Sequence, residues 1–431
     1  MALSNTITTI LRDPYAHSKY RTEFRLDDEN LYMLPSMRLC NLGAWSAQLD
    51  DDTGVYYLPL TGVASCIQSI ALYLNGTLVD NNDDVAVSVA LRNLRKSNAE
   101  NQDIGRWTSM AGLGFDVGTY ENPTNLCLTL SSKWYENAHV QGGVDHDAAF
   151  GMWQVADNDQ GTSGSVLLGD LLEFVRTANQ SGVPAMPAKD VRIVITWNMG
   201  SSGFVQDPDA ATQVPSIESL GLQPMRPFLI CDQLVGVPPQ PKMQLTYFST
   251  IVEKLPLPAG INGVPLIVNR KSMAFNQKML NDLTIVLIPS GDDAAGRWQG
   301  QLNQFLATQD TYQLVLNGAN FLPNQGDSHA GFRLYYANDA FGSMNIPMAG
   351  YVEYLGASDL ILEYPDTECA TADLTGAVNV ASYKIGQMVD RLQVNYQRAS
   401  WSGDHDACTL YLLGRVARVL TLNGDQVSLA S

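Results

Sequence analysis

Short segments with alternating apolar residues recur along this chain, and this pattern restricts the possible fold more than any other feature. In residues 191–197, apolar side chains stand at positions 191, 193, 195 and 197, while Arg192 and Thr196 lie between them. Successive side chains of a strand point to opposite faces, so this segment predicts a strand with one buried face. The other predicted strands cover residues 67–74, 228–234, 243–251, 283–288, 312–316 and 409–420.

The segments between these strands have the composition of turns and loops. The 35 glycines and 20 prolines are spread along the chain, and Asn75-Gly76 follows an apolar run as in a tight hairpin turn. Helical periodicity is confined to residues 166–178 and 298–307. Residues 50–53, 80–84, 141–147 and 201–215 are expected to be loops. The sequence therefore predicts an all-β sandwich with many loops.

The charge balance argues against direct binding to nucleic acid. The chain has 26 basic and 44 acidic residues, a formal net charge of -18, and its basic residues are gathered only at Arg92, Arg95 and Lys96 and at Arg270-Lys271. Phosphate binding needs clustered lysine and arginine. Charged residues make up only 16% of the chain, a low value that suits a protein that covers much of its surface with neighbouring subunits.

The cysteines and the apolar segments bear on the cellular compartment. The six cysteines stand at positions 40, 66, 127, 231, 369 and 408, without the paired spacing of a zinc or redox site. We therefore expect free thiols in a reducing compartment. Residues 1–10 lack the pattern of a signal peptide, and no run of 18 apolar residues predicts a membrane span.

Two triplets, Asp145-His146-Asp147 and Asp404-His405-Asp406, contain residue types that bind metals. Neighbouring residues on a strand point to opposite faces, and both triplets lie beside glycines, so we interpret them as polar loops. The acidic clusters Asp50-Asp51-Asp52 and Asp83-Asp84 lack the spacing of a calcium loop and are interpreted as solvated turns. We therefore assign no catalytic, cofactor-binding or metal-binding residue, expect no cofactor, and predict that the chain is not an enzyme.

Several short segments, read in order, resemble a viral protein family. They are Leu34-Pro35, Arg38-Leu39, Asn41-Leu42-Gly43, Pro59-Leu60, Ser69-Ile70, Leu72-Tyr73-Leu74, Leu171-Leu172, Arg192-Ile193, Phe228-Leu229-Ile230-Cys231-Asp232 and Phe275-Asn276. Their order resembles the penton, or minor capsid, proteins of the adenovirus–tectivirus lineage, with the closest similarity to those of virophages and Polinton/adinto-like viruses. This resemblance implies a jelly-roll sandwich that begins with the strands around residues 34–76.

The resemblance and the length together imply a domain organisation. We expect an N-terminal arm over residues 1–25, which ties the protein to its neighbours, and a jelly-roll domain over residues 26–240. Residues 241–431 would form a second β-rich domain, or a continuation or insertion of the jelly roll, with the boundary at the proline-rich segment 236–241.

The function implied by the resemblance is structural. The chain would form pentamers at the vertices of an icosahedral virion, in contact with neighbouring capsid proteins, after assembly inside the host cell. One alternative is a major capsid protein with two jelly rolls, which forms trimers. Two further alternatives are a non-viral carbohydrate-binding β-sandwich, with Trp134, Tyr135 and Trp153 stacking on sugars, and a hydrolase with a metal at the Asp-His-Asp triplets.

Overall fold

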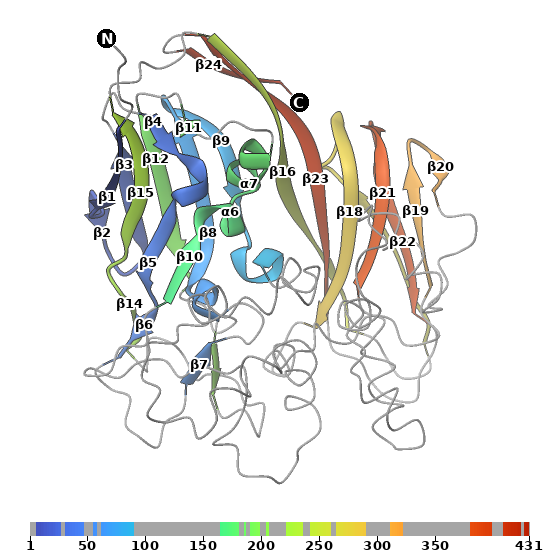
Figure 1. Ribbon diagram of the computed structural model, residues 1–431. Coiled ribbons are helices and arrows are strands. Elements are labelled where there is room, and N and C mark those ends of the chain that lie inside the picture. The colour runs from blue at the N-terminus through green and yellow to red at the C-terminus, as the bar shows by residue number, and fades with distance from the viewer. Residues whose placement is uncertain are drawn as a thin grey trace, which may run out of the picture.

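The computed structural model is β-rich and describes the strand framework of the chain (Figure 1). The described residues are 6–26, 31–46, 55–57, 62–89, 164–180, 185–186, 190–198, 204–206, 221–235, 242–259, 264–289, 311–321, 380–398, 408–423 and 426–430. Within them, strands greatly outnumber helices, and all the strand pairs are antiparallel. The predicted all-β class is confirmed.

The first sandwich is formed by two sheets from the first half of the chain. One, the β15 sheet, contains β1 (Thr6–Arg12), β4 (Leu31–Met33), β5 (Arg38–Leu42), β10 (Gly164–Leu167), β11 (Ala185–Met186) and β15 (Phe228–Val235). The other, the β12 sheet, contains β2 (Ala16–His17), β3 (Arg21–Leu26), β8 (Ile67–Leu74), β9 (Thr77–Asn82) and β12 (Val191–Trp197). Short pairs join β6 (Ala44–Trp45) to β14 (Gln223–Pro224) and β7 (Val55–Tyr57) to β13 (Phe204–Gln206).

The second sandwich is formed by the second half of the chain. Its β23 sheet contains β16 (Lys242–Leu257), β18 (Lys278–Pro289), β21 (Val380–Val389), β23 (Cys408–Asn423) and β24 (Gln426–Ala430). Its β22 sheet contains β17 (Leu266–Ser272), β19 (Thr311–Leu316), β20 (Ala319–Asn320) and β22 (Leu392–Arg398). The break between the two sets of strands falls between Val235 and Lys242, on either side of the proline-rich segment.

The strand pairing in the second sandwich is nested. Its first strand, β16, pairs with the last of eight, β23, and then β17 pairs with β22, β18 with β21, and β19 with β20. This wrapped order of eight antiparallel strands in two sheets is the jelly roll. The first sandwich has the same nesting. In it, β1 pairs with β15, β3 with β12, β4 with β11, β5 with β10, and β8 with β9. The chain therefore contains two jelly rolls in tandem.

Two equivalent turns mark the same position in each jelly roll. Asn75 and Asn317 each precede a glycine, have positive φ angles of 46° and 53°, and connect β8 to β9 and β19 to β20. The Asn75 Oδ1 accepts a hydrogen bond from the backbone N–H of Asp190 at 3.1 Å, and the Asn317 Oδ1 accepts one from Asp390 at 2.8 Å. The predicted tight turn at residues 75–76 is confirmed, and the second jelly roll repeats its tertiary contact.

Several local predictions are corrected by the structure. The helix predicted over residues 166–178 is divided into α6 (Leu168–Leu171) and α7 (Glu173–Gln180), because Leu172 is extended with φ −120° and ψ 121°. Two short 3-10 turns, η1 (Leu34–Ser36) and η2 (Gly62–Cys66), were not predicted. The loop expected over residues 80–84 begins as strand, since Asp80 lies in β9 and is 1% exposed. The second predicted helix, residues 298–307, lies outside the described residues.

The described residues of the expected N-terminal arm are part of the first jelly roll. All seven residues of β1 pair with β15, and β3 pairs with β12 and buries Phe24 completely. These residues therefore do not form a free arm, because their backbone hydrogen bonds and a core side chain are committed to the two sheets. The expectation for residues 1–25 is corrected for this part.

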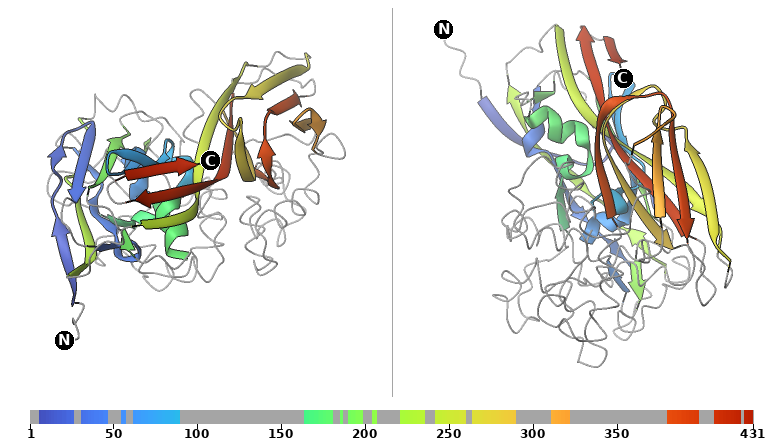
Figure 2. Two further views of the ribbon diagram at one scale, coloured as in Figure 1. Left: turned by 90° about the horizontal axis from the view of Figure 1, so that it is seen from above. Right: turned by 90° about the vertical axis from the view of Figure 1, so that its right-hand side faces the viewer.

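The two longest strands belong to both sandwiches. Strands β16 and β23 pair without interruption from Lys242↔Asn423 to Leu257↔Cys408. At one end of this ribbon, Leu245, Tyr247 and Leu420 lie in the core of the first sandwich, and at the other end Leu255 and Leu410 lie in the core of the second. The views of Figure 2 show the ribbon passing from one sandwich to the other. The two jelly rolls are therefore joined by a shared structural element, and not only by a linker.

The close approach at Gly414 gives a test of this ribbon. A Cβ atom at Gly414 would lie 2.3 Å from the Phe275 ring and 2.7 Å from Leu280, both fully buried in the second core. We expect Gly414→Ala to lower the free energy of unfolding by about 1–3 kcal/mol, as overpacking does in other cores. Urea denaturation followed by tryptophan fluorescence measures this.

A matched control is available in α6. A Cβ at Gly169 would meet only ordinary contacts at 3.7 Å, and alanine favours the helix. Gly169→Ala should therefore leave stability unchanged or raise it slightly. Equal stability of the Gly414→Ala protein and the wild type would contradict the packing described.

Candidate functional site at the junction of the sandwiches

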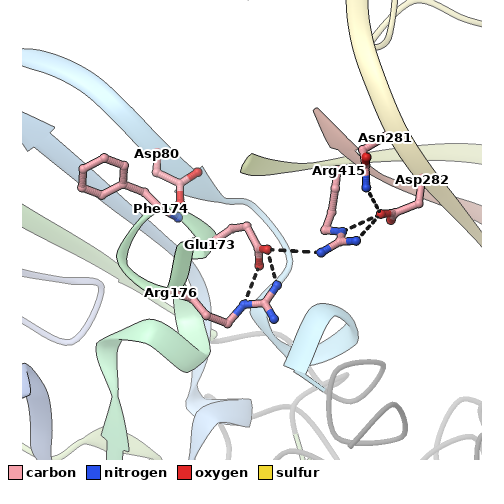
Figure 3. Close-up of polar contacts among 7 residues, drawn as sticks. All are labelled: Asp80, Glu173, Phe174, Arg176, Asn281, Asp282 and Arg415. Atoms are coloured by element: carbon pink, nitrogen blue, oxygen red, sulfur yellow. Dashed lines mark hydrogen bonds and ion pairs between the residues drawn. The ribbon is translucent and has the colours of Figure 1, made fainter. Parts of the chain in front are cut away.

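Part of the outer face of the β23 sheet, along β16 and β23, packs against the first jelly roll. Helix α7 packs on β16, and β9 contacts β16 as well (Figure 1). Leu413 on β23 lies in the first core, whereas its neighbour Leu412 lies in the second. Polar and charged side chains from both jelly rolls meet in this buried junction, and Figure 3 shows seven of its residues.

Asp80 is a deeply buried acidic group at the junction, with an exposure of 1%. One carboxylate oxygen accepts a hydrogen bond from the backbone N–H of Phe174 at 2.8 Å, and the other accepts one from the Ser249 hydroxyl at 2.6 Å. The first bond satisfies a free N–H in the first turn of α7, which explains why the helix restarts after the extended Leu172. The second bond ties β9 of the first jelly roll to β16 of the second.

Burial controls the protonation of Asp80. Loss of solvation raises the pKa of this carboxyl from 3.8 to about 6, although the hydrogen bonds from Ser249 and Phe174 act in the opposite direction. Among charged neighbours, Glu173 raises this pKa and Arg418 lowers it. The ionised carboxylate is therefore costly in the folded protein, and the neutral acid is favoured more strongly than in the unfolded chain.

Arg415 links carboxylates that belong to different jelly rolls. Its Nε donates to Asp282 Oδ2 at 2.6 Å, and its Nη1 lies 3.7 Å from Glu173 Oε1 (Figure 3). Asp282 is on β18 of the second jelly roll, and Glu173 begins α7 of the first. Arg176, one turn along α7, donates from Nε to Glu173 at 3.1 Å. The result is a chain of alternating charges across the junction, in which each buried carboxylate has a guanidinium partner.

A β-bulge places Asp282 in this chain. The register of β18 against β23 shifts between Leu280 and Asp282, so Asn281 is the extra residue opposite β23, whereas the shift against β21 places the extra residue on β21. The bulge lets Leu280 and Leu283 both face the second core, while Asp282 turns to the junction directly beside Arg415. The Asn281 amide also donates to the Asp282 carboxylate at 2.9 Å.

Further contacts close the junction around these groups. The Tyr247 hydroxyl donates to the carbonyl of Val79 at 2.6 Å, and its ring packs edge to face on Phe174 with 4.8 Å between centroids. Lys254 lies 2.6 Å from the Asp84 carboxylate. Burial alone would lower the pKa of Lys254, but Asp84 raises it above its usual value. These contacts again join β16 to the first jelly roll.

One of the predicted acidic clusters, Asp83-Asp84, has a structural role, and the other candidate sites lie outside the described residues. Asp84 accepts a hydrogen bond from the N–H of Val87 at 3.2 Å and pairs with Lys254, so it caps a helical turn. The triplets at 145–147 and 404–406, the cluster at 50–52 and the three candidate sugar-binding aromatics lie outside the described residues. Within the described strand framework, no group of three or more His, Cys, Asp or Glu is placed to hold a metal ion.

Two further observations concern the cysteines and the helices of the described residues. Cys40, Cys66 and Cys231 are buried, and burial raises the pKa of the Cys231 thiol to about 11. Among the described residues, none of the helices has the length and apolar character needed to cross a bilayer.

The comparisons with known proteins concern the fold. No family model and no curated protein matches the chain. A chain of the cryo-EM structure of the Sputnik virophage has a TM-score of 0.59 at 9% identity, covering 100% of this chain and 89% of that one. The crystal structure of the mavirus major capsid protein has a TM-score of 0.50 at 11% identity, covering 98% and 90%. The quasi-atomic model of the PBCV-1 virus capsid has a TM-score of 0.50 at 11% identity, covering 99% and 96%.

These likenesses extend over both sandwiches, because they cover nearly all of this chain. The predicted jelly-roll fold is therefore confirmed, and the second β-rich region is itself a jelly roll. At such low identity the comparisons establish the fold alone.

The charge chain at the junction predicts a large effect of removing Arg415. Arg415→Met would leave Asp282 buried without its guanidinium partner, and Glu173 would lose Arg415 while keeping Arg176. Breaking a buried ion pair by removing one partner costs about 3–5 kcal/mol, and we expect a loss of this size in the free energy of unfolding.

The control is Arg391→Met, since Arg391 lies in an exposed turn and donates to Gln393 at 3.3 Å. It should change stability by less than about 0.5 kcal/mol. Chemical denaturation of both variants measures the difference. A loss below about 1 kcal/mol for Arg415→Met would mean that the junction does not depend on this residue.

The raised pKa of Asp80 should make the free energy of unfolding depend on pH. Its folded pKa lies above its unfolded value, so the proton is held more tightly in the folded state. Protonated Asp80 contributes roughly 3 kcal/mol to the free energy of unfolding. This contribution is present in full below about pH 4 and is lost as the pH rises through about 6. Asp80→Asn mimics the neutral acid, so the variant should lose this part of the pH dependence and match or exceed the wild type at pH 7.

Denaturation curves at a series of pH values test this expectation. Asp83→Asn is the control, because Asp83 is exposed and lies only three residues from Asp80. It should keep the slope of the wild type. An Asp80→Asn protein with an unchanged slope between about pH 4 and pH 6 would show that Asp80 does not titrate in this range.

Proposed function

We propose that the chain is a structural protein of a viral capsid and acts as the major, shell-forming subunit. The observation that carries this proposal is the presence of two complete jelly rolls in one chain, fused through a ribbon that contributes to both cores. Jelly rolls are common in viral capsid proteins. One of the similar structures is the mavirus major capsid protein, and its likeness extends over both jelly rolls of this chain.

The second jelly roll favours the shell subunit over the vertex subunit. A penton with one jelly roll leaves about half of this chain to be explained as an insertion. Here the second half is instead a full nested sandwich of eight strands, extended by β24. Three such chains would bring together six jelly rolls of similar shape, which gives a nearly hexagonal block able to tile a surface. The pentamer inferred from the sequence resemblance remains the second candidate.

A rigid junction suits the role of a shell subunit. Tiling requires that the two jelly rolls of each subunit keep a fixed relation to each other. The junction supplies this through packed apolar side chains and through the hydrogen bonds and ion pairs of Asp80 and Arg415. In this proposal the chain has no catalytic role, its partners are further copies of itself and neighbouring capsid proteins, and it is located in the virion.

Native mass spectrometry of the purified protein tests the assembly state. We expect a trimer that persists at micromolar concentration, since shell subunits bury well over about 800 Å² per partner. Electron microscopy of the same sample should show blocks of nearly hexagonal outline. A pentamer would contradict this proposal and support the penton. A stable monomer that binds glycans on an array would instead support a carbohydrate-binding module.

A further inference from the structure

The outer face of the β12 sheet has a row of arginine and tyrosine side chains. The strand register places Arg192 on β12 directly between Arg25 on β3 and Tyr73 on β8. The Arg25 guanidinium lies over the ring of Tyr15 at 4.0 Å, and the Arg192 guanidinium lies over the ring of Tyr73 at 4.6 Å. We call these four residues, Tyr15, Arg25, Arg192 and Tyr73, the arginine–tyrosine row.

The row is accessible and is flanked by other exposed side chains. Tyr15 is 67% exposed, and Leu78, the cross-strand neighbour of Tyr73, is 39% exposed. The side chain of Arg25 is 36% exposed. Tyrosine and arginine are the residue types most enriched at the centres of protein interfaces. Their gathering on one outer sheet face therefore marks a surface suited to a protein partner.

The row also has a surplus of positive charge. Arg25 and Arg192 are cross-strand neighbours, and like charges in this position destabilise a sheet. Glu23 is the carboxylate on the same face, but it binds both Arg25, at 2.7 Å, and Arg21, at 3.1 Å. Two guanidinium groups therefore share one carboxylate, and Arg192 adds a further positive charge beside Arg25. The Nε of Arg192 is buried and has no hydrogen-bond partner among the described residues.

We propose that the arginine–tyrosine row docks an acidic surface of a second copy of this chain. A carboxylate from a partner would reduce the repulsion between the two arginines, and a guanidinium group can bind a carboxylate through two parallel N–H···O bonds. A second copy supplies such a surface, because the chain has 44 acidic residues against 26 basic ones. A basic patch of one copy on a different, acidic patch of the next is a heterologous contact, the type that closes rings.

This inference deepens the proposed function and rests on it, since it identifies one side of the contact between subunits. It predicts that Arg25→Gln/Arg192→Gln weakens self-association. Loss of two charge-assisted contacts should raise the concentration at which the oligomer dissociates by at least about tenfold. The oligomer of the wild type should also weaken as salt increases, whereas the double variant should lose most of this dependence.

Native mass spectrometry over a dilution series at low and high salt provides the measurement. The matched control is Arg270→Gln/Lys271→Gln, which removes two cations from exposed positions on β17 of the second jelly roll. It should associate like the wild type. Circular dichroism and thermal melting confirm that both double variants are folded. If the double variant Arg25→Gln/Arg192→Gln associates as tightly as the wild type, the inference fails while the proposed function stands; if the wild type never associates, both fail.

Chemical crosslinking identifies the occupant of the row. Arg25→Lys keeps the charge and introduces an amine, which a carbodiimide joins to a carboxylate in contact. With mixed isotope-labelled and unlabelled protein, we expect crosslinks from position 25 to Asp or Glu of the other copy. Crosslinks only within one copy, to Glu23 for example, would overturn the inference. So would tight binding of a single-stranded DNA oligonucleotide that the Arg25→Gln/Arg192→Gln variant loses, because the row would then serve a polyanion.

Discussion

The uninterrupted pairing of β16 with β23 is the constraint on which the rest of the structure depends. A strand pair of sixteen residues is about 50 Å long, far longer than one sandwich requires. The ribbon can bury its full length only by serving one core at Leu255 and another at Leu245. Strand twist makes this possible, because one face of the ribbon turns from the second core to the first along its length. The relative placement of the two jelly rolls thus follows from a single pair of strands.

The polar junction follows from the same constraint. Because the first jelly roll packs against part of the outer face of the β23 sheet, charged residues in the middle of its strands lose much of their contact with water, and the side chains of Arg415 and Asp282 are only 25% and 2% exposed. Arg415 and Asp282 therefore pair with each other, and Arg415 extends the pairing to Glu173 of the first jelly roll. An apolar junction could be equally stable, since desolvation offsets much of the energy of buried ion pairs. What the charges add is directionality, because hydrogen bonds and ion pairs require one register of the two surfaces, whereas apolar contacts tolerate several.

The strands could be predicted from the sequence, while the junction could not. Residues 67–74 and 191–197 form strands with the bounds expected from their alternation, because each has one face on the core and one toward solvent. The sequence indicates a loop at Asp80, since the acidic stretch that ends in Asp83-Asp84 has the composition of a solvated turn. Its burial depends on Ser249, which lies 169 positions away. No local pattern reports a contact that is created by the docking of two domains.

The relation between the two halves was also hidden in the sequence, and for a related reason. Jelly-roll pairing joins the first strand to the last, so each sandwich is defined by contacts between distant residues and tolerates almost any apolar alternation. What the halves share is a backbone requirement. Asn75 and Asn317 both adopt positive φ, and each carboxamide accepts a hydrogen bond from a residue that leads into the strand paired with the first strand of the hairpin. Asn-Gly pairs are common in tight turns, and this chain has four of them, so the two at residues 75–76 and 317–318 attract little notice until the pairing order shows that they occupy one position in two equivalent folds.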